Sequence, residues 1–111
     1  MAVYIPRKGD FVAVDFDPQS GHEQRGRRPA LVISNDLFNK ATGLCIVCPV
    51  TNARRGYPFH VAIPEGLGVA GVVMVEQVKS LDFHARSVKR IGCAPEAVLE
   101  EVLSILDACV Y

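Results

Sequence analysis

The stretch LCIVCPVT at residues 44–51 is apolar and rich in β-branched side chains, which is typical of a buried strand. It also contains Cys45 and Cys48 at the C-x-x-C spacing of zinc and dithiol sites. Residues three apart in a strand point to opposite faces, so these thiols are not expected to share a metal ion. A redox pair would need a helix start, and none follows. We therefore predict a strand, no metal or cofactor, and buried structural thiols, Cys93 and Cys109 included.

Further strands are predicted on both sides of this stretch. Apolar or alternating patterns between turn signals occur at residues 11–16, 29–34, 59–63, 71–75, 77–81 and 88–93, with a helical turn at 35–40. After Ala94 the period becomes helical: Val98, Val102, Ile105 and Cys109 fall on one face. The pattern predicts a mainly β fold with α, namely a small, partly open barrel of about six short strands with a C-terminal helix.

Length and composition limit the possible classes of protein. The chain has 111 residues, half of them apolar, which suits one core and a single domain over residues 1–111 and excludes a multidomain enzyme. The longest apolar stretch, residues 66–75, is too short to span a membrane, and the N-terminus lacks a signal sequence, so we expect a cytoplasmic protein.

The net charge of the chain is zero, but the charges are unevenly distributed. Residues 1–55 hold eight basic and five acidic residues, while the charged residues of 95–111 are four acidic ones. A basic body of this kind is compatible with a phosphate-binding face.

Two polar loops carry the candidate chemistry. Residues 17–28 contain no apolar side chain but include His22, Glu23 and Arg28, and Thr51 ends a predicted strand beside a loop with Arg54 and Arg55. If the loops meet, these groups could cleave RNA without a metal, because the 2′-hydroxyl is the substrate's own nucleophile. Glu23 or His22 would act as the base, Arg28 would stabilise charge on the phosphorus, and Thr51 would donate a hydrogen bond.

Each of these residues also has a structural interpretation. Glu23 could pair with Arg25 or Arg27 on a solvated loop, and His22 could be a surface imidazole. Thr51 could fill a strand end or cap a turn. Spacing alone leaves both interpretations open.

Short motifs in a fixed order extend over nearly the whole chain. They are YIP at 4–6, GD at 9–10, VDFDP at 14–18, GHEQ at 21–24, RPA at 28–30, TG at 42–43, PVT at 49–51, GYPF at 56–59 and QVKS at 77–80. In order and spacing the chain resembles the MazF/PemK family of toxins, the endoribonucleases called mRNA interferases.

The resemblance implies an SH3-like barrel that works as a two-fold homodimer and cuts single-stranded mRNA at short sequences without a metal. The expected products carry a 2′,3′-cyclic phosphate and a 5′-hydroxyl. By position, Arg28 and Thr51 form the catalytic pair and Glu23 is important for activity. The resemblance also implies four base contacts, namely Gln24, Asn35, Glu76 and Gln77. To these substrate-binding residues we add His22, Arg27, Arg54, Arg55 and Lys79.

The resemblance also implies a cognate MazE-like antitoxin whose acidic tail blocks the RNA groove and which could carry the toxin to operator DNA. Three positions depart from the family pattern. His22 stands where serine is usual, Asn52 where a second hydroxyl is frequent, and His60 at a site that is often acidic. These departures bear on the cleavage sequence and the pH optimum.

Two alternative functions remain from the sequence. A gyrase-poisoning toxin of the same fold would rely on a C-terminal tryptophan, whereas this chain has no tryptophan and ends in Cys109, Val110 and Tyr111. An RNA-binding module without catalysis would need only the basic loops. A binder should lose affinity gradually as arginines are removed, whereas Arg28→Ala in an enzyme should abolish cutting and spare binding.

Overall fold

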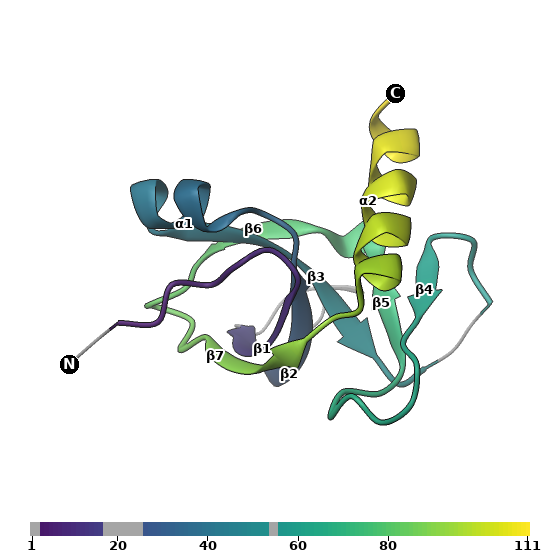
Figure 1. The fold of residues 1–111 in the computed structure, drawn as a ribbon, viewed down its shortest axis with the longest axis horizontal. Helices are drawn as coiled ribbons and strands as arrows, with labels where there is room; N and C mark the ends of the chain where they lie inside the picture. The colour runs from purple at the N-terminus through teal and green to yellow at the C-terminus, as the bar shows by residue number, and fades with distance from the viewer. Residues whose placement is uncertain (1–2, 17–25, 54–55) are drawn as a thin grey trace.

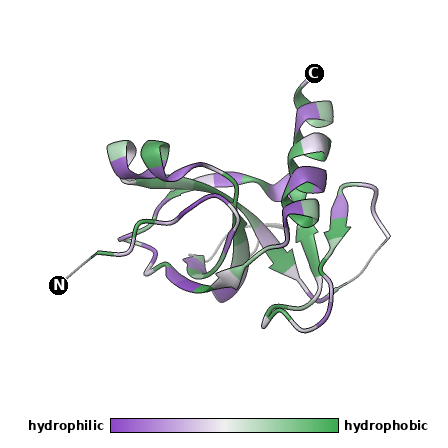
Figure 2. Ribbon diagram, viewed as in Figure 1, coloured by the Kyte–Doolittle hydropathy of each residue, from purple (hydrophilic) through white to green (hydrophobic). Residues whose placement is uncertain are grey.

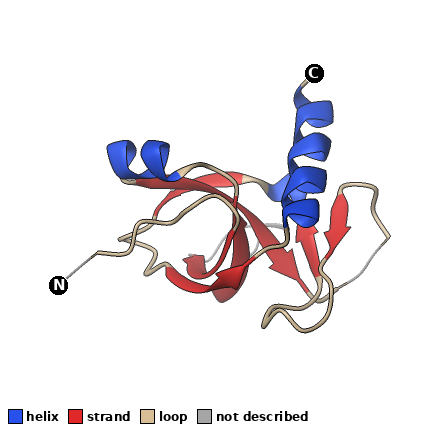
Figure 3. Cartoon of the chain, viewed as in Figure 1, coloured by secondary structure: helices blue, strands red, loops and turns tan. Residues whose placement is uncertain are grey.

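The computed structural model describes residues 3–16, 26–53 and 56–111. Strands make up the body of the molecule and the two helices lie outside it (Figures 1 and 3). In chain order the elements are β1 (Asp10–Phe16), β2 (Gly26–Val32), α1 (Asp36–Thr42), β3 (Leu44–Thr51), β4 (His60–Ala62), β5 (Val72–Met74), the 3-10 helix η1 (Val75–Gln77), β6 (Lys79–Asp82), β7 (Lys89–Cys93) and α2 (Glu96–Val110). Within these ranges no helix is both long and apolar enough to cross a membrane.

The strands form one antiparallel sheet that curls without closing. Its order is β4-β5-β3-β2-β1-β7, and β6 pairs with β3 as well. β3 therefore belongs to both halves: its first part pairs with β2 and β6, and its end pairs with β5. The prediction of a partly open, mainly β barrel with a C-terminal helix is confirmed, with seven described strands in place of about six.

Two apolar cores lie on opposite sides of the central strands. The first core contains Phe11, Leu31, Cys48 and Val50, and the second contains Val12, Ala30, Cys45 and Val47. Neighbouring residues of β1, β2 and β3 thus alternate between the cores. Because both faces are buried there, the central parts of these strands are apolar, and β3 is apolar over nearly its whole length, as the hydropathy colours of Figure 2 show.

Helix α2 covers the first core with residues up to Leu106. Val98 and Val102 are buried there, whereas the last turns project away from the sheet (Figure 1). Val110 and Tyr111 are 66% and 96% exposed. Cys109, which the helical pattern placed on the buried face, is exposed for the same reason, and Cys93 at the end of β7 is exposed as well. The prediction of buried thiols is therefore wrong for these two cysteines.

Buried polar groups fasten the N-terminal segment and α1 to one end of the barrel. Asp10 accepts hydrogen bonds from Tyr4 Oη at 2.5 Å and from the backbone N–H of Arg7 at 3.1 Å, and Arg90 Nε lies 3.4 Å from it. We call this the anchor end and define it by the residues Tyr4, Asp10, Ser34, Asn39 and Arg90.

At the same end, fully buried Asn39 of α1 donates through Nδ2 to the carbonyls of Pro6 and Ser34 at 2.7 and 3.1 Å. Its Oδ1 accepts from Ser34 Oγ at 2.5 Å, and Ser34 Oγ in turn accepts from the backbone N–H of Ile46 at 2.8 Å. One side chain therefore links three segments of the chain.

The start of β2 differs from the sequence expectation. Arg27 and Arg28 were assigned to the end of a polar loop, but β2 begins at Gly26 and pairs with β1 from Phe16↔Gly26 onward. No apolar side chain marks these residues as a strand. Instead, pairing with β1 extends the ladder, and Arg27 forms an ion pair with Asp15, the residue opposite it.

Candidate functional site

Arg28 and Thr51 lie on the same face of the barrel wall, at the end opposite the anchor end. Side chains two residues apart in a strand point to the same face. Arg28 therefore shares a face of β2 with Ala30 and Val32, and Thr51 shares a face of β3 with Val47, all three of which belong to the second core. The register that pairs Ala30 with Pro49 sets Arg28 across from Thr51 when it is continued by two residues. Arg28 is exposed and Thr51 is half-buried, which suits groups that meet a ligand.

Lys79 joins them from a third strand. It pairs with Val47 across β6 and β3 and shares its face with Leu81 of the second core. Its Nζ lies 5.2 Å from the centre of the Phe16 ring, which ends β1. The cation–π contact holds the ammonium group over the barrel wall. We call Phe16, Arg28, Thr51 and Lys79 the site end.

Thr51 is fixed by its surroundings through both its side chain and its backbone. Its Oγ1 accepts a hydrogen bond from the backbone N–H of Ala53 at 3.2 Å, so the hydroxyl proton is not used in that contact. Its carbonyl lies against Gly71, which has φ +114°, and a Cβ there would meet that oxygen at 2.1 Å. The turn-capping interpretation of Thr51 is thus seen, and it leaves the O–H able to donate to a phosphate.

Arg27 points away from Arg28, although the two are neighbours. Its Nη1 lies 2.9 Å from Asp15 Oδ1, and its Nη2 donates to the carbonyl of Ser87 at 3.1 Å. The guanidinium is therefore engaged on the opposite face of the sheet. Its expected role as a phosphate contact stays a prediction that this arrangement does not favour.

The expected base contacts lie in two places. Glu76 and Gln77 are in η1, which Val78 separates from Lys79, and Glu76 forms an ion pair with His60. Asn35 lies at the anchor end instead, where its Oδ1 caps α1 by accepting from the backbone N–H of Phe38 at 2.8 Å. Glu76 and Gln77 thus lie between β5, which pairs with the end of β3, and β6, which carries Lys79, whereas Asn35 lies at the other end.

Five expected site residues lie outside the described part of the chain: His22, Glu23, Gln24, Arg54 and Arg55. Two segments hold these residues. One connects Phe16, the end of β1, to Gly26, the start of β2, and the other follows Ala53, shortly after the end of β3. The candidate base Glu23 thus belongs to the connection between Phe16 and Gly26.

Cys45 and Cys48 are buried in different cores, as the strand interpretation predicted. Burial raises the pKa of each thiol to about 12, so both stay protonated and unreactive at neutral pH. In the residues that the structure describes, no group of three or more His, Cys, Asp or Glu side chains is arranged to hold a metal ion.

Sequence reasoning missed one contact at this side of the molecule. His60 was noted as a departure from the family pattern, but its partner was not identified. His60 Nε2 lies 3.0 Å from Glu76 Oε2, sixteen residues away in the chain. Only the pairing of β4 with β5, which sets His60 opposite Met74, would have revealed it.

Comparisons with known proteins agree with this architecture. Residues 7–110 match the family described as the PemK-like, MazF-like toxin of type II toxin-antitoxin system. The endoribonuclease toxin MazF of Escherichia coli K12 is 45% identical over 94 residues, which cover 84% of each chain. A crystal structure of MazF from Deinococcus radiodurans is 46% identical, with a TM-score of 0.93 over 97% of this chain and 98% of that one.

A MazE–MazF structure from the same organism is also similar, with 46% identity and a TM-score of 0.88 over 97% of both chains. The family match covers most of the sequence, and the identity exceeds what shared architecture alone produces. The chain therefore belongs to the PemK-like, MazF-like toxins of type II toxin–antitoxin systems.

Proposed function

We propose that this protein is a sequence-specific, metal-independent endoribonuclease toxin that cleaves single-stranded mRNA. The observation that carries the proposal is the site end, where β2, β3 and β6 direct Arg28, Thr51 and Lys79 to one face. Its relatives in Escherichia coli are named endoribonucleases, including ChpB and PemK. The proposed chemistry is attack of the substrate's 2′-hydroxyl on the adjacent phosphorus, which leaves a 2′,3′-cyclic phosphate and a 5′-hydroxyl.

Each residue has a distinct part in this reaction. The Arg28 guanidinium stays protonated and offers a planar pair of donors to the phosphoryl oxygens as negative charge develops on them. Thr51 Oγ donates a neutral hydrogen bond, and Lys79 adds positive charge nearby. Glu23, or its sequence neighbour His22, removes the proton of the 2′-hydroxyl, and the departing 5′-oxygen takes up a proton from water.

We propose the partners from the same family membership. MazE–MazF structures show that relatives bind an antitoxin, and we expect a MazE-like antitoxin to neutralise this chain. A two-fold homodimer is the proposed working form, and an antitoxin complex on operator DNA would bind through the antitoxin. We place the activity in the cytoplasm, where mRNA is translated.

The proposal is tested by incubating the purified protein with a long RNA in EDTA and mapping the breaks. We expect breaks at a short recurring sequence, each with a cyclic phosphate on one fragment and a 5′-hydroxyl on the other. Breaks with 3′-hydroxyl ends, or cutting only after a divalent ion is added, would overturn the mechanism. Intact RNA with measurable binding would instead favour an RNA-binding module.

A further inference from the structure

His60 and Thr51 lie on the same face of the β3–β5–β4 part of the sheet. Val50, Val73 and Val61 enter the first core, so their neighbours along the three strands point the other way. Thr51 is opposite Val72, and His60 is opposite Met74, two residues further along β5. From ordinary strand spacing and rise, the Cα atoms of His60 and Thr51 are about 12 Å apart.

The His60 ring is held against Glu76. Its Nε2 lies 3.0 Å from Glu76 Oε2, and the imidazole is 5% exposed while the carboxylate is 33% exposed. A carboxylate only accepts hydrogen bonds, so Nε2 carries the proton of this contact. The Tyr57 ring lies 5.0 Å away at 49° and packs against the imidazole. The ring therefore has one orientation, with Nε2 directed at Glu76.

One backbone hydrogen bond joins the same two segments, and another closes the turn before β4. The carbonyl of Phe59 accepts from the backbone N–H of Val75 at 3.1 Å, and the backbone N–H of His60 donates to the carbonyl of Tyr57 at 3.1 Å. The start of β4 thus supports η1, which carries Glu76 and Gln77 and leads into Lys79. Glu76, one of the expected base contacts, therefore lies beside His60.

The other ring nitrogen does not explain why a histidine stands at this position. Among the described residues, His60 Nδ1 is buried without a hydrogen-bond partner. An unpaired buried polar atom destabilises a fold, and an apolar ring would fill the same space without that cost. The contact that distinguishes histidine from such a ring is the one that Nε2 makes with Glu76.

We propose that His60 is a positioning residue that orients Glu76 to recognise a nucleobase beside the scissile linkage, and thereby helps to set the cleavage sequence. This inference rests on the proposed endoribonuclease function. Glu76 is partly exposed and only Oε2 faces His60, so Oε1 is left to meet a base. A carboxylate accepts hydrogen bonds and selects bases that present an N–H donor.

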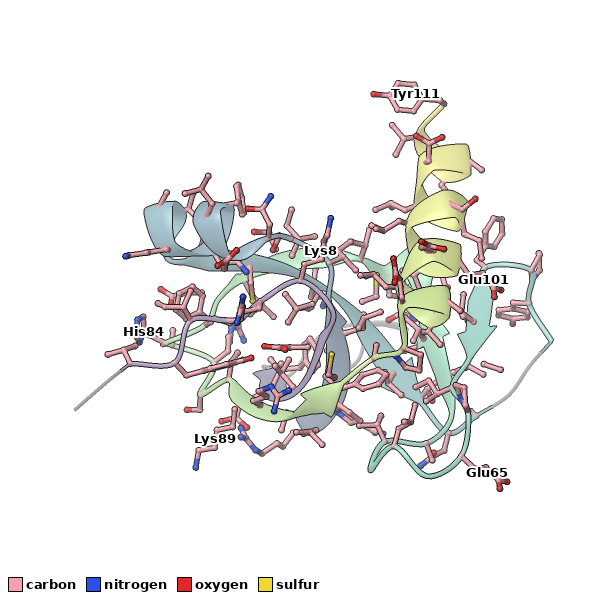
Figure 4. All side chains as sticks on the ribbon, viewed as in Figure 1. Lys8, Glu65, His84, Lys89, Glu101 and Tyr111 are labelled. Atoms are coloured by element: carbon pink, nitrogen blue, oxygen red, sulfur yellow. The ribbon has the colours of Figure 1, made fainter. Side chains whose placement is uncertain are left out.

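The test compares His60→Leu, which loses the donor, with His60→Gln, which retains an N–H at similar reach. His84→Gln is the matched control, because His84 is exposed in the turn before β7 (Figure 4). The substrates are two RNA oligonucleotides that differ by one base next to the break, chosen from the wild-type cleavage map. The measured quantity is the ratio of their kcat/KM values.

We expect His60→Leu to lower this ratio by about tenfold, chiefly through KM, which is within the usual range for losing a base contact. His60→Gln should recover most of it and His84→Gln should keep the wild-type ratio. A ratio within twofold of wild type in folded His60→Leu would overturn the proposal. Wild-type protein that leaves RNA intact would overturn the proposed function instead.

A double-mutant cycle decides the question if His60→Leu does not fold. His60→Asn is polar but too short to reach the carboxylate, and Glu76→Gln removes the charge. If His60 acts through Glu76, the double variant should discriminate no worse than Glu76→Gln alone. Losses that multiply in the double variant would show independent roles and contradict the proposal.

Discussion

The anchor end and the site end of the barrel use polar side chains in opposite ways, although β1, β2 and β3 run through both. At the anchor end, Asp10 and Asn39 are 5% and 0% exposed, and each has several hydrogen-bond partners within the chain. At the site end, Arg28 is exposed, Thr51 is half-buried and Lys79 lies over an aromatic ring. The difference agrees with the proposal that one end stabilises the fold and the other meets the substrate.

The largest expected effect is on activity, at the site end. Arg28→Ala should lower the cleavage rate by about 10²- to 10³-fold, because it removes the donors that stabilise charge in the transition state. Lys89→Ala is a charge-matched control: Lys89 is exposed on β7 opposite Ala13, on the other face of the sheet (Figure 4). Single-turnover cleavage and urea unfolding check both variants. A loss shared equally by Lys89→Ala would show that net charge, and not the site end, governs activity.

Asn39→Ala should produce the converse result at the anchor end. It leaves the carbonyls of Pro6 and Ser34 and the hydroxyl of Ser34 without their partner, which should lower the free energy of unfolding by about 2–4 kcal/mol. Lys40→Ala, at the neighbouring exposed position of α1, should change it by less than about 0.5 kcal/mol. Cleavage per folded molecule should stay near wild type in both. Lost cleavage in folded Asn39→Ala would break the division between the two ends.

A smaller effect on activity is expected for Thr51→Val, which keeps the branched shape and removes the hydroxyl. The cleavage rate should fall by about 10- to 100-fold, since a neutral donor contributes less than a guanidinium. Thr51→Ser should retain most of the activity. The rates of the two variants under single-turnover conditions check this, and equal losses would mean that the hydroxyl has no chemical part.

The smallest effect is a pH dependence of stability near the anchor end. The backbone N–H of Ala85, together with that of His84, donates to Asp82 Oδ1 and lowers the pKa of this carboxyl. A lowered pKa in the folded state contributes stability above the unfolded value of about 3.9. That contribution is lost as the pH falls through the folded pKa.

The difference in unfolding midpoint between wild type and Asp82→Asn should therefore shrink as the pH is lowered from 6 toward 2. Asp107→Asn, at an exposed position of α2, serves as the control. Cleavage at neutral pH should be unaffected by either change. A midpoint difference that grows on acidification would contradict the assigned role of the turn.

Much of the fold could be predicted from the sequence because the central strands are buried on both faces. Residues 44–51 form β3 with the predicted bounds, and Cys45 and Cys48 enter different cores as strand alternation requires. The start of β2 could not be predicted, because pairing with β1 and not apolar content makes Gly26–Arg28 a strand. The exposure of Cys109 could not be predicted either, because helical periodicity does not tell where the core ends.

The site was predictable only in part. Family motifs pointed to Arg28 and Thr51, Lys79 was added as a phosphate contact, and the strand registers place the three on one face. The contact of His60 with Glu76 depends on the β4–β5 register, which no local pattern specifies. The role of Asn39 likewise depends on a segment 33 residues away in sequence.

The most direct test of the proposed chemistry is a 2′-deoxy substitution at the nucleotide whose hydroxyl is the nucleophile, in an otherwise unchanged RNA oligonucleotide. Binding and cleavage are measured in EDTA, with the substitution moved by one nucleotide as the control. We expect the substituted RNA to bind as well as the unmodified RNA and to remain uncut, while the control is cleaved. Cleavage of the deoxy substrate at the same linkage would contradict the account.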